Sequence, residues 1–118
     1  MGKKETLLKI VVIELEDVIE DLNALIDSYS KRNKAGEVTD YVYKENIALL
    51  TNEQNCIREF HRELKTVDVS AYADEKETAL KLKQIFLDLL CEHCYAPAVE
   101  SIVKRKIEKA LDFIISPP

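Results

Sequence analysis

The sequence predicts an all-α fold, an antiparallel up-down-up-down four-helix bundle that forms a single domain over residues 1–118. In the first third of the chain, apolar residues recur in alternating steps of four and three, which keeps one stripe of a helix against a neighbour. Only two Gly and three Pro interrupt the 118 residues, and no stretch alternates apolar and polar residues as strands do. A hydrophobic content of 47% in a chain of this length is enough for one core but not for two.

The first helix is expected over residues 5–35. Gly36 should end it in the left-handed conformation, and the basic residues Lys31, Arg32 and Lys34 in its last turn complement the negative end of the helix dipole. Branched residues alternate with leucine along its apolar stripe, as helix seams prefer. This stripe consists of Leu8, Val12, Leu15, Ile19, Leu22, Ile26 and Tyr29.

The second helix is expected to begin at Thr39 or Asp40 and to continue to about Lys65. Val38, just before it, can pack onto Tyr43 across the first turn as a hydrophobic staple. The helix has an apolar stripe of its own, which would face the first helix and the core. This second stripe consists of Tyr43, Ile47, Leu50, Ile57 and Leu64.

The third helix is expected to start with Ser70 as its cap, and the fourth with Pro97 in its first turn. Both carry one apolar face. The core face of the third helix consists of Ala79, Leu82, Ile85, Phe86, Leu89 and Leu90. That of the fourth consists of Val99, Ile102, Val103, Ile107, Ala110, Leu111 and Ile114.

Short connections make neighbouring helices antiparallel. If the chain folds back about Gly36, Asp68 and Tyr95, the residues that lie level with each other have numbers that add to about 73, 136 and 190. These pairings predict which side chains from different helices can meet.

The chain carries a formal charge of −5 with a pI near 5.1, so its surface as a whole repels phosphate groups. We therefore expect no nucleic-acid partner. No stretch approaches the roughly 20 apolar residues of a membrane span, and we expect no membrane partner either. Three cysteines, an odd number, fit a reduced cytoplasmic protein better than a disulfide scaffold.

Cys91 and Cys94, with His93 between them, form a motif that could bind zinc or exchange disulfides. A zinc site needs further ligands, and Cys56 is predicted to lie about 11 residues, or roughly 16 Å, away from Cys91 along the bundle axis. The pair also lies near a helix C-terminus, where the dipole disfavours a thiolate. We expect structural thiols and no metal or cofactor, and a thiol or zinc protein is one alternative.

An acidic cluster in the first helix suggests another alternative. Glu16-Asp17-x-x-Glu20 followed by Glu37-x-x-Asp40 loosely resembles the carboxylate signature of helical metal-dependent nucleotide pyrophosphohydrolases. The resemblance implies a nucleotide hydrolase that uses Mg²⁺ or Mn²⁺. The cluster consists of Glu14, Glu16, Asp17, Glu20 and Asp21. Most of it should face solvent rather than the core, and exposed ion pairs with the fourth helix are expected near Glu20 and Asp21. The bases concerned are Lys104, Arg105, Lys106 and Lys109.

Other catalytic templates are missing from the sequence. A ferritin-like di-iron centre needs Glu three residues before His, but Arg58 precedes His61 and Leu90 precedes His93. There is no glycine-rich phosphate loop and no nucleophile elbow. His61 falls on the apolar stripe of its helix, where we expect a hydrogen bond to Tyr72 or Glu75.

Two surfaces are more suggestive of binding. Four of the five tyrosines should gather at one tip of the bundle, beside Cys91, His93 and Cys94, where they could dock a partner or plug the open end. These are Tyr29, Tyr41, Tyr43 and Tyr95. At the opposite end, Ile10, Ile13, Phe113 and Ile115 form a patch. Its apolar surface is larger than one helix stripe can bury in the core, which suggests a homodimer or a partner site. We therefore expect a non-enzymatic protein-protein interaction module, such as an adaptor, chaperone or regulator.

Overall fold

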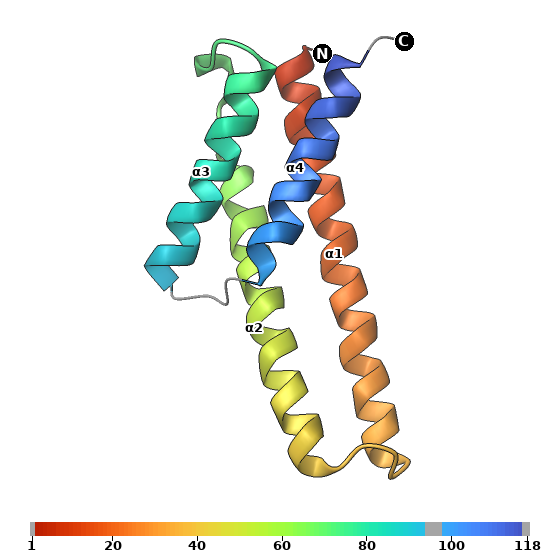
Figure 1. The fold of residues 1–118 in the computed structure, drawn as a ribbon. Coiled ribbons are helices and arrows are strands. Elements are labelled where there is room, and N and C mark those ends of the chain that lie inside the picture. Colours follow the sequence, from red (N-terminus) through yellow and green to blue (C-terminus); the bar gives the residue numbers. More distant parts are fainter. Residues whose placement is uncertain (1, 94–97, 117–118) are drawn as a thin grey trace.

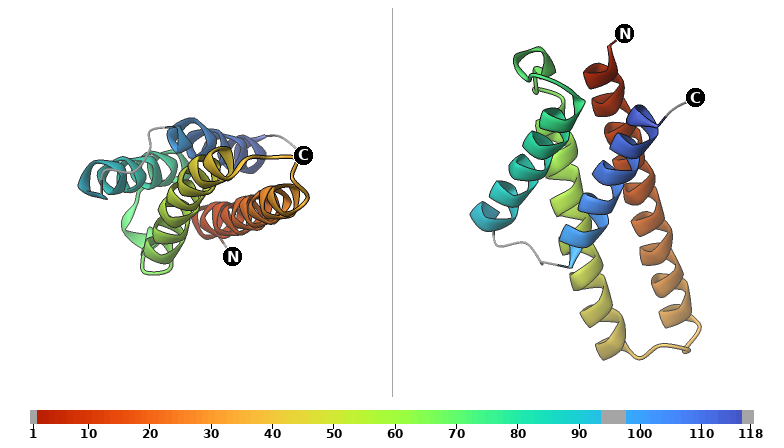
Figure 2. Two further views of the ribbon diagram at one scale, coloured as in Figure 1. Left: turned by 90° about the horizontal axis from the view of Figure 1, so that it is seen from below. Right: turned by 45° about the horizontal axis from the view of Figure 1, so that its top comes forward.

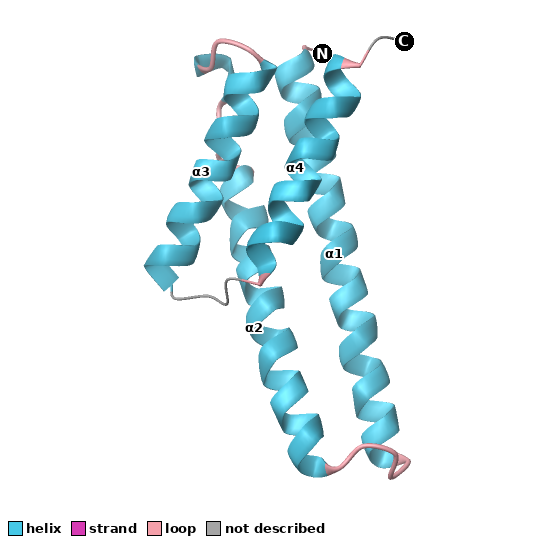
Figure 3. Ribbon diagram, viewed as in Figure 1, coloured by secondary structure: helices cyan, strands magenta, loops and turns pink. Residues whose placement is uncertain are grey.

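The computed structural model describes residues 2–93 and 98–116, and these form four α-helices and one 3₁₀ turn, with no strand in the described part. The elements are α1 (Lys3–Lys34), α2 (Asp40–Leu64), η1 (Val69–Ala71), α3 (Glu75–His93) and α4 (Val99–Ile115). Consecutive helices run in opposite directions (Figures 1 and 3). The predicted all-α four-helix bundle is therefore confirmed.

The turn between α1 and α2 begins at the predicted glycine. Gly36 has a φ of +79°, and its N–H donates to the carbonyl of Asn33 (3.1 Å) while the N–H of Glu37 donates to that of Arg32 (2.9 Å). This pair of hydrogen bonds is a Schellman motif, which satisfies carbonyls that the helix end leaves without partners. Glycine is needed here because a side chain at this φ would be strained.

The start of α2 also follows the sequence pattern. The hydroxyl of Thr39 accepts from the N–H of Val42 (3.3 Å), as an N-cap does, and Val38 beside it is buried. Farther along, the side-chain amide of Gln54 donates to the carbonyl of Ile19 (3.3 Å) and to the side-chain oxygen of Asn23 (2.6 Å). These contacts agree with the level pairing predicted for the first two helices.

The core lies between the upper parts of all four helices. Its largest fully buried side chains are Phe60, Phe86, Leu7, Leu15, Ile57, Leu64, Leu82, Leu89, Ile107, Val11, Val99 and Val103. In α1 the line of deepest burial runs through Leu7 and Val11, whereas Leu8 and Val12 of the predicted stripe are only partly buried. The first half of α1 is apolar on several sides, so periodicity alone does not choose which side faces the core.

The connection between α2 and α3 differs from the prediction. Ser70 does not cap α3, because it lies within η1, where its hydroxyl and its N–H donate to the carboxylate of Asp68 (2.6 and 3.0 Å). The helix instead begins after Asp74, whose carboxylate accepts from the N–H of Glu77 (2.8 Å). Ala73, the residue before this cap, donates its N–H to the Glu77 carboxylate (2.6 Å).

This longer connection displaces α3 along the bundle. Phe60 of α2 packs on Phe86 of α3 with ring centroids 5.0 Å apart, whereas a fold-back about Asp68 would place Phe60 level with about residue 76. The displacement is about ten residues, or roughly 15 Å. The α3–α4 pairing is as predicted, because Lys83 meets Glu108 at 3.1 Å. Pro97 and Tyr95, expected near the start of the fourth helix, lie outside the described residues.

Helix α4 is displaced from its predicted level in the same direction as α3. Lys106 forms an ion pair with Glu14 (2.9 Å), about seven residues from the predicted level at Asp21. An ion pair between α1 and α4 is present as expected, but it forms at Glu14 rather than near Glu20 and Asp21. This pairing places Val99, the first residue of α4, level with about residue 21 of α1.

The four helices are unequal in length, and this determines the shape of the molecule. Helix α1 has 32 residues and α2 has 25, whereas α3 has 19 and α4 has 17. The two shorter helices cover only the upper part of the α1–α2 hairpin, and the rest of the hairpin continues as a two-helix extension (Figures 1 and 2). We call this extension the arm, and define it as residues 23–34 of α1 and 40–53 of α2.

Candidate functional site

The described thiols lie in two different environments. Cys56 is fully buried in the core, and burial raises the pKa of its thiol to about 11, whereas Cys91 is exposed on α3. The displacement of α3 brings Cys91 level with about residue 55, so the predicted offset of about 11 residues from Cys56 along the bundle axis is wrong. Cys94 lies outside the described residues. Within the described ranges, no three His, Cys, Asp or Glu side chains converge as metal ligands.

Two carboxylates of the acidic cluster contact different partners, and the other three are exposed. Glu14 pairs with Lys106, and Glu16 contacts the Nε2 of His61 at 3.2 Å. His61 therefore meets α1, and its partner is neither Tyr72 nor Glu75. The remaining members of the cluster, Asp17, Glu20 and Asp21, are exposed.

The two carboxylates that complete the hydrolase-like pattern lie at the far end of the hairpin. Glu37 lies 3.6 Å from the guanidinium of Arg32, and Asp40 accepts from the side-chain amide of Asn33 (2.9 Å). They end up near the turn rather than beside the cluster on α1. The geometry therefore lacks the converging oxygens that a divalent cation needs, as far as the described residues extend.

The tyrosines lie at the tip of the arm. Tyr29 and Tyr43 are half-buried, Tyr41 is exposed, and the Arg32 guanidinium lies 5.7 Å from the centre of the Tyr29 ring. The end of α3, which carries Cys91 and His93, is well above this tip (Figure 1). The expected gathering of tyrosines with the thiol motif is therefore not formed by the described residues, and Tyr95 is not among them.

The aliphatic patch at the other end divides between two surfaces. Ile10 and Phe113 line one cavity of about 370 Å³ together with Glu14 and Lys109, and Phe113 is 73% exposed. Ile13 lies at the edge of a different cavity. Ile115 is exposed near the end of α4 and lines neither cavity.

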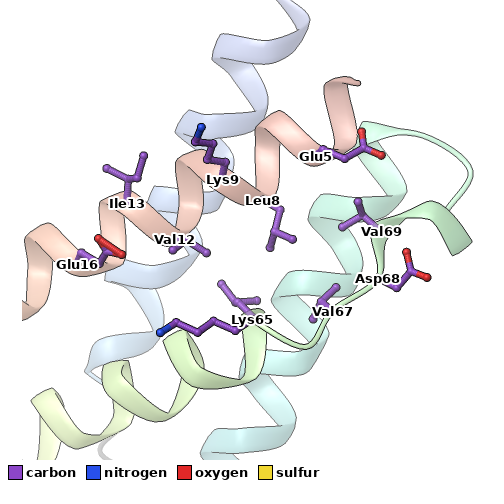
Figure 4. Close-up of a pocket in the computed structure, with 11 residues that line it drawn as sticks. Glu5, Leu8, Lys9, Val12, Ile13, Glu16, Lys65, Val67, Asp68 and Val69 are labelled. Carbon is purple, nitrogen blue, oxygen red and sulfur yellow. The ribbon is translucent and has the colours of Figure 1, made fainter. Parts of the chain in front are cut away.

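The cavity beside Ile13 is the larger of the two, at about 620 Å³. One wall is α1, and the other is formed by the end of α2 and the segment that leads into η1 (Figure 4). Leu8 and Val12 of α1 point across it toward Lys65 and Val67 (Figure 4). We call it the α1–η1 groove, and its lining consists of Glu5, Leu8, Lys9, Val12, Ile13, Glu16, Leu64, Lys65, Val67, Asp68 and Val69.

The groove has an aliphatic floor and a charged rim. Its rim carries both signs, with Glu5, Lys9 and Glu16 on α1 and Lys65 and Asp68 on the opposite wall. Hydrogen bonds from the side chain and backbone of a neighbouring serine hold the pKa of Asp68 below its usual value, so this carboxylate stays charged at neutral pH. An apolar surface bordered by mixed charge is typical of a protein-binding site.

The sequence prediction missed most of this groove. Leu8 and Val12 were expected in the seam, and only Ile13 was expected to contact a partner. A signal was present in the run of apolar residues around α1, which exceeds what one core face needs. The opposite wall, with Val67 and Val69, depends on the path of the connection after α2, which local patterns do not specify.

No helix in the described part of the chain combines the length and the hydrophobicity that crossing a lipid bilayer requires. Comparison of the chain with models of protein families, with curated proteins and with solved structures finds no match.

Proposed function

We propose that this chain is a non-enzymatic protein-binding module, and that it holds an amphipathic helix of a partner protein in the α1–η1 groove. The observation that carries this proposal is the open aliphatic floor formed by Leu8, Val12 and Val67, with the exposed side chain of Ile13 at its edge. When a partner covers apolar surface that water would otherwise contact, the free energy of the complex falls.

The dimensions and charges of the groove favour a helix as its occupant. The α1 wall extends from Glu5 to Glu16, about 16 Å or three helical turns. A helix of similar length can place apolar side chains at i, i+4 and i+7 on the floor, as helix-in-groove complexes do. Rim charges of both signs, such as Lys9 and Glu16 on one wall, would then fix its direction and register.

A binding role also agrees with the chemistry of the described side chains. The carboxylates of α1 pair with Lys106 and His61 or project singly into solvent. Cys56 is buried with a raised pKa, and this makes it a poor nucleophile. We place this activity in the cytoplasm, where the free thiols would remain reduced.

Selection from a displayed library of amphipathic helical peptides of about three turns, a length set by the groove, would test this function. We expect selected peptides to bind the intact chain and to lose at least tenfold in affinity when Val12→Arg is introduced into the groove. Leu80→Ser on α3 is the matched control, because Leu80 is an exposed aliphatic residue that does not line the groove.

NMR shift mapping with a selected peptide should perturb the amides around Leu8 and Val67 and leave those of the arm unchanged. The proposal fails if selection yields no helical binder, or if the binders are indifferent to Val12→Arg. A helicity check by circular dichroism on each variant separates loss of the site from loss of the fold.

A further inference from the structure

The arm exposes an apolar helix face. In the upper part of the bundle, α3 and α4 cover the corresponding face of α1 and α2. Leu25 of α1 and Val42 and Leu49 of α2 are 47%, 43% and 50% exposed, although all three are aliphatic. They belong to the two-helix part of the hairpin that α3 and α4 do not reach (Figure 2).

Helical geometry shows that these side chains share one face. Glu14 contacts α4 through Lys106, and Leu25 follows it by eleven residues, or three turns, on the same side of α1. Phe60 contacts α3 through Phe86, and Leu49 precedes it by eleven residues on the same side of α2. Val42 lies two turns before Leu49 on that side. The open face of the arm is therefore a continuation of the surface that α3 and α4 cover above it.

We propose that a second copy of this chain covers this face, and that two arms pack antiparallel across a two-fold axis to complete a four-helix bundle. The arm is half of such a bundle, and an identical arm has the length and the apolar face to supply the other half. A parallel arrangement would direct the helices of the second copy into the space that α3 and α4 occupy. In the antiparallel arrangement, each tip instead reaches only the first turn of α4 of the other copy.

The charges of the arm are consistent with self-association. Residues 23–53 contain four Lys or Arg and five Asp or Glu, so the segment carries −1 of the −5 of the whole chain. Asp21, at the base, and Arg32, near the tip, are exposed and lie eleven residues apart on the same side of α1. A two-fold antiparallel pairing brings Asp21 of each copy to Arg32 of the other, which forms two equivalent ion pairs.

The first test is the mass in solution, measured by sedimentation equilibrium across a hundredfold range of concentration, since self-association depends on concentration. We expect the intact chain to reach twice its 13.5 kDa. The double variant Leu25→Glu, Leu49→Glu should remain at the mass of one chain, because it places charge in the centre of the interface. Leu80→Glu is the matched control, since Leu80 is 64% exposed on α3 and lies outside the arm.

The second test is a charge exchange that only the antiparallel two-fold arrangement explains. Asp21→Arg alone and Arg32→Asp alone each create two repulsive pairs, and we expect each to weaken self-association about tenfold. An equimolar mixture of the two variants restores attraction at both pairs and should form the mixed dimer. The measurement is again sedimentation, with one variant carrying a fluorescent label.

The outcomes are decisive in either direction. A single-chain mass at every concentration, or a dimer that survives Leu25→Glu with Leu49→Glu, overturns the proposal. So does a dimer that Leu80→Glu disrupts equally. If the mixed charge variants associate no better than each one alone, the antiparallel arrangement is wrong. Unchanged helicity by circular dichroism confirms that each variant is folded, and the α1–η1 groove is not altered by any of them.

Discussion

The contact between Phe86 and Phe60 tests the level of α3 in the bundle, and replacement of Phe86 by alanine tests its burial. Phe86 is fully buried, and its ring packs on that of Phe60 at a centroid distance of 5.0 Å and an interplanar angle of 57°. If α3 were placed as the sequence alone predicts, Phe60 would instead lie level with about residue 76. Phe86 belongs to the core face of α3 at either level, so the contact that exists only in the displaced arrangement is its coupling to Phe60.

The expected cost follows from burial and ring geometry. Removing a buried Phe side chain costs about 3–5 kcal/mol through lost transfer free energy and the cavity that remains. The tilted aromatic pair accounts for about 0.5–1.5 kcal/mol of this loss, beyond its buried area. We expect a loss near the middle of these values, about 4 kcal/mol, from a free energy of unfolding of roughly 6–18 kcal/mol for a chain of this length.

Urea unfolding followed by circular dichroism at 222 nm is the assay. With a slope of about 2 kcal/mol per molar urea, a loss of about 4 kcal/mol lowers the midpoint by about 2 M. The control is Phe113→Ala, which removes the same side chain from a position that is 73% exposed. That substitution should change the free energy of unfolding by no more than about 0.5 kcal/mol.

A double-mutant cycle isolates the pair itself. Phe60→Leu, Phe86→Leu and the double substitution should give a coupling energy of about 0.5–1.5 kcal/mol. The reasoning is refuted if the coupling is zero within error, or if Phe86→Ala costs no more than Phe113→Ala. A coupling of zero would return α3 to the level predicted from sequence, and Cys91 to a level distant from Cys56. A small cost of Phe86→Ala would instead show that Phe86 is not in the core.

Three further predictions concern the turn and the thiols. Gly36→Ala should lower the free energy of unfolding in urea by about 1 kcal/mol, because alanine is strained at a φ of +79°. In a Cys94→Ser background, a thiol reagent should modify Cys91 at once and Cys56 only after denaturant is added; simultaneous modification of both would show that Cys56 is not in the core. Burial raises the pKa of Cys56 from 9.0 to about 11, so the folded state favours the neutral thiol, and its contribution to stability should be lost as pH rises from 9 toward 11. Cys56→Ala should remove that part of the pH dependence, measured by urea unfolding at pH 8 to 11.

The sequence predicts those features that depend on local interactions. The end of α1 was predictable because a left-handed residue after the last turn calls for glycine, and Gly36 supplies it. The cap of α3 was ambiguous, because Ser70 and Asp74 are both good N-caps and only the path of the chain selects between them. The wrong choice placed α3 about ten residues from its true level and misplaced every contact derived from that level.

The candidate site is less predictable from sequence than the fold, for a related reason. An apolar residue on a helix can face the core, a groove or solvent, and its spacing distinguishes these only if the helix has one apolar side. The first half of α1 has more than one, so Leu8 was assigned to the seam although it lines a groove. The arm was not predictable at all, since it follows from the unequal coverage of α1 and α2 by the shorter helices.

The two proposed surfaces lie at opposite ends of α1, and their separation has a functional consequence. The α1–η1 groove begins near Glu5, whereas the arm ends beyond Lys34. An antiparallel dimer through the arms would therefore carry a groove at each distal end, with both open to solvent. A partner that presents two helices on a linker long enough to span them would bind far more tightly than one that presents a single helix, because its second contact is intramolecular. Leu25→Glu with Leu49→Glu should remove this gain and leave single-helix affinity unchanged, whereas Val12→Arg should weaken both, and only a chain that uses both surfaces gives this combination of results.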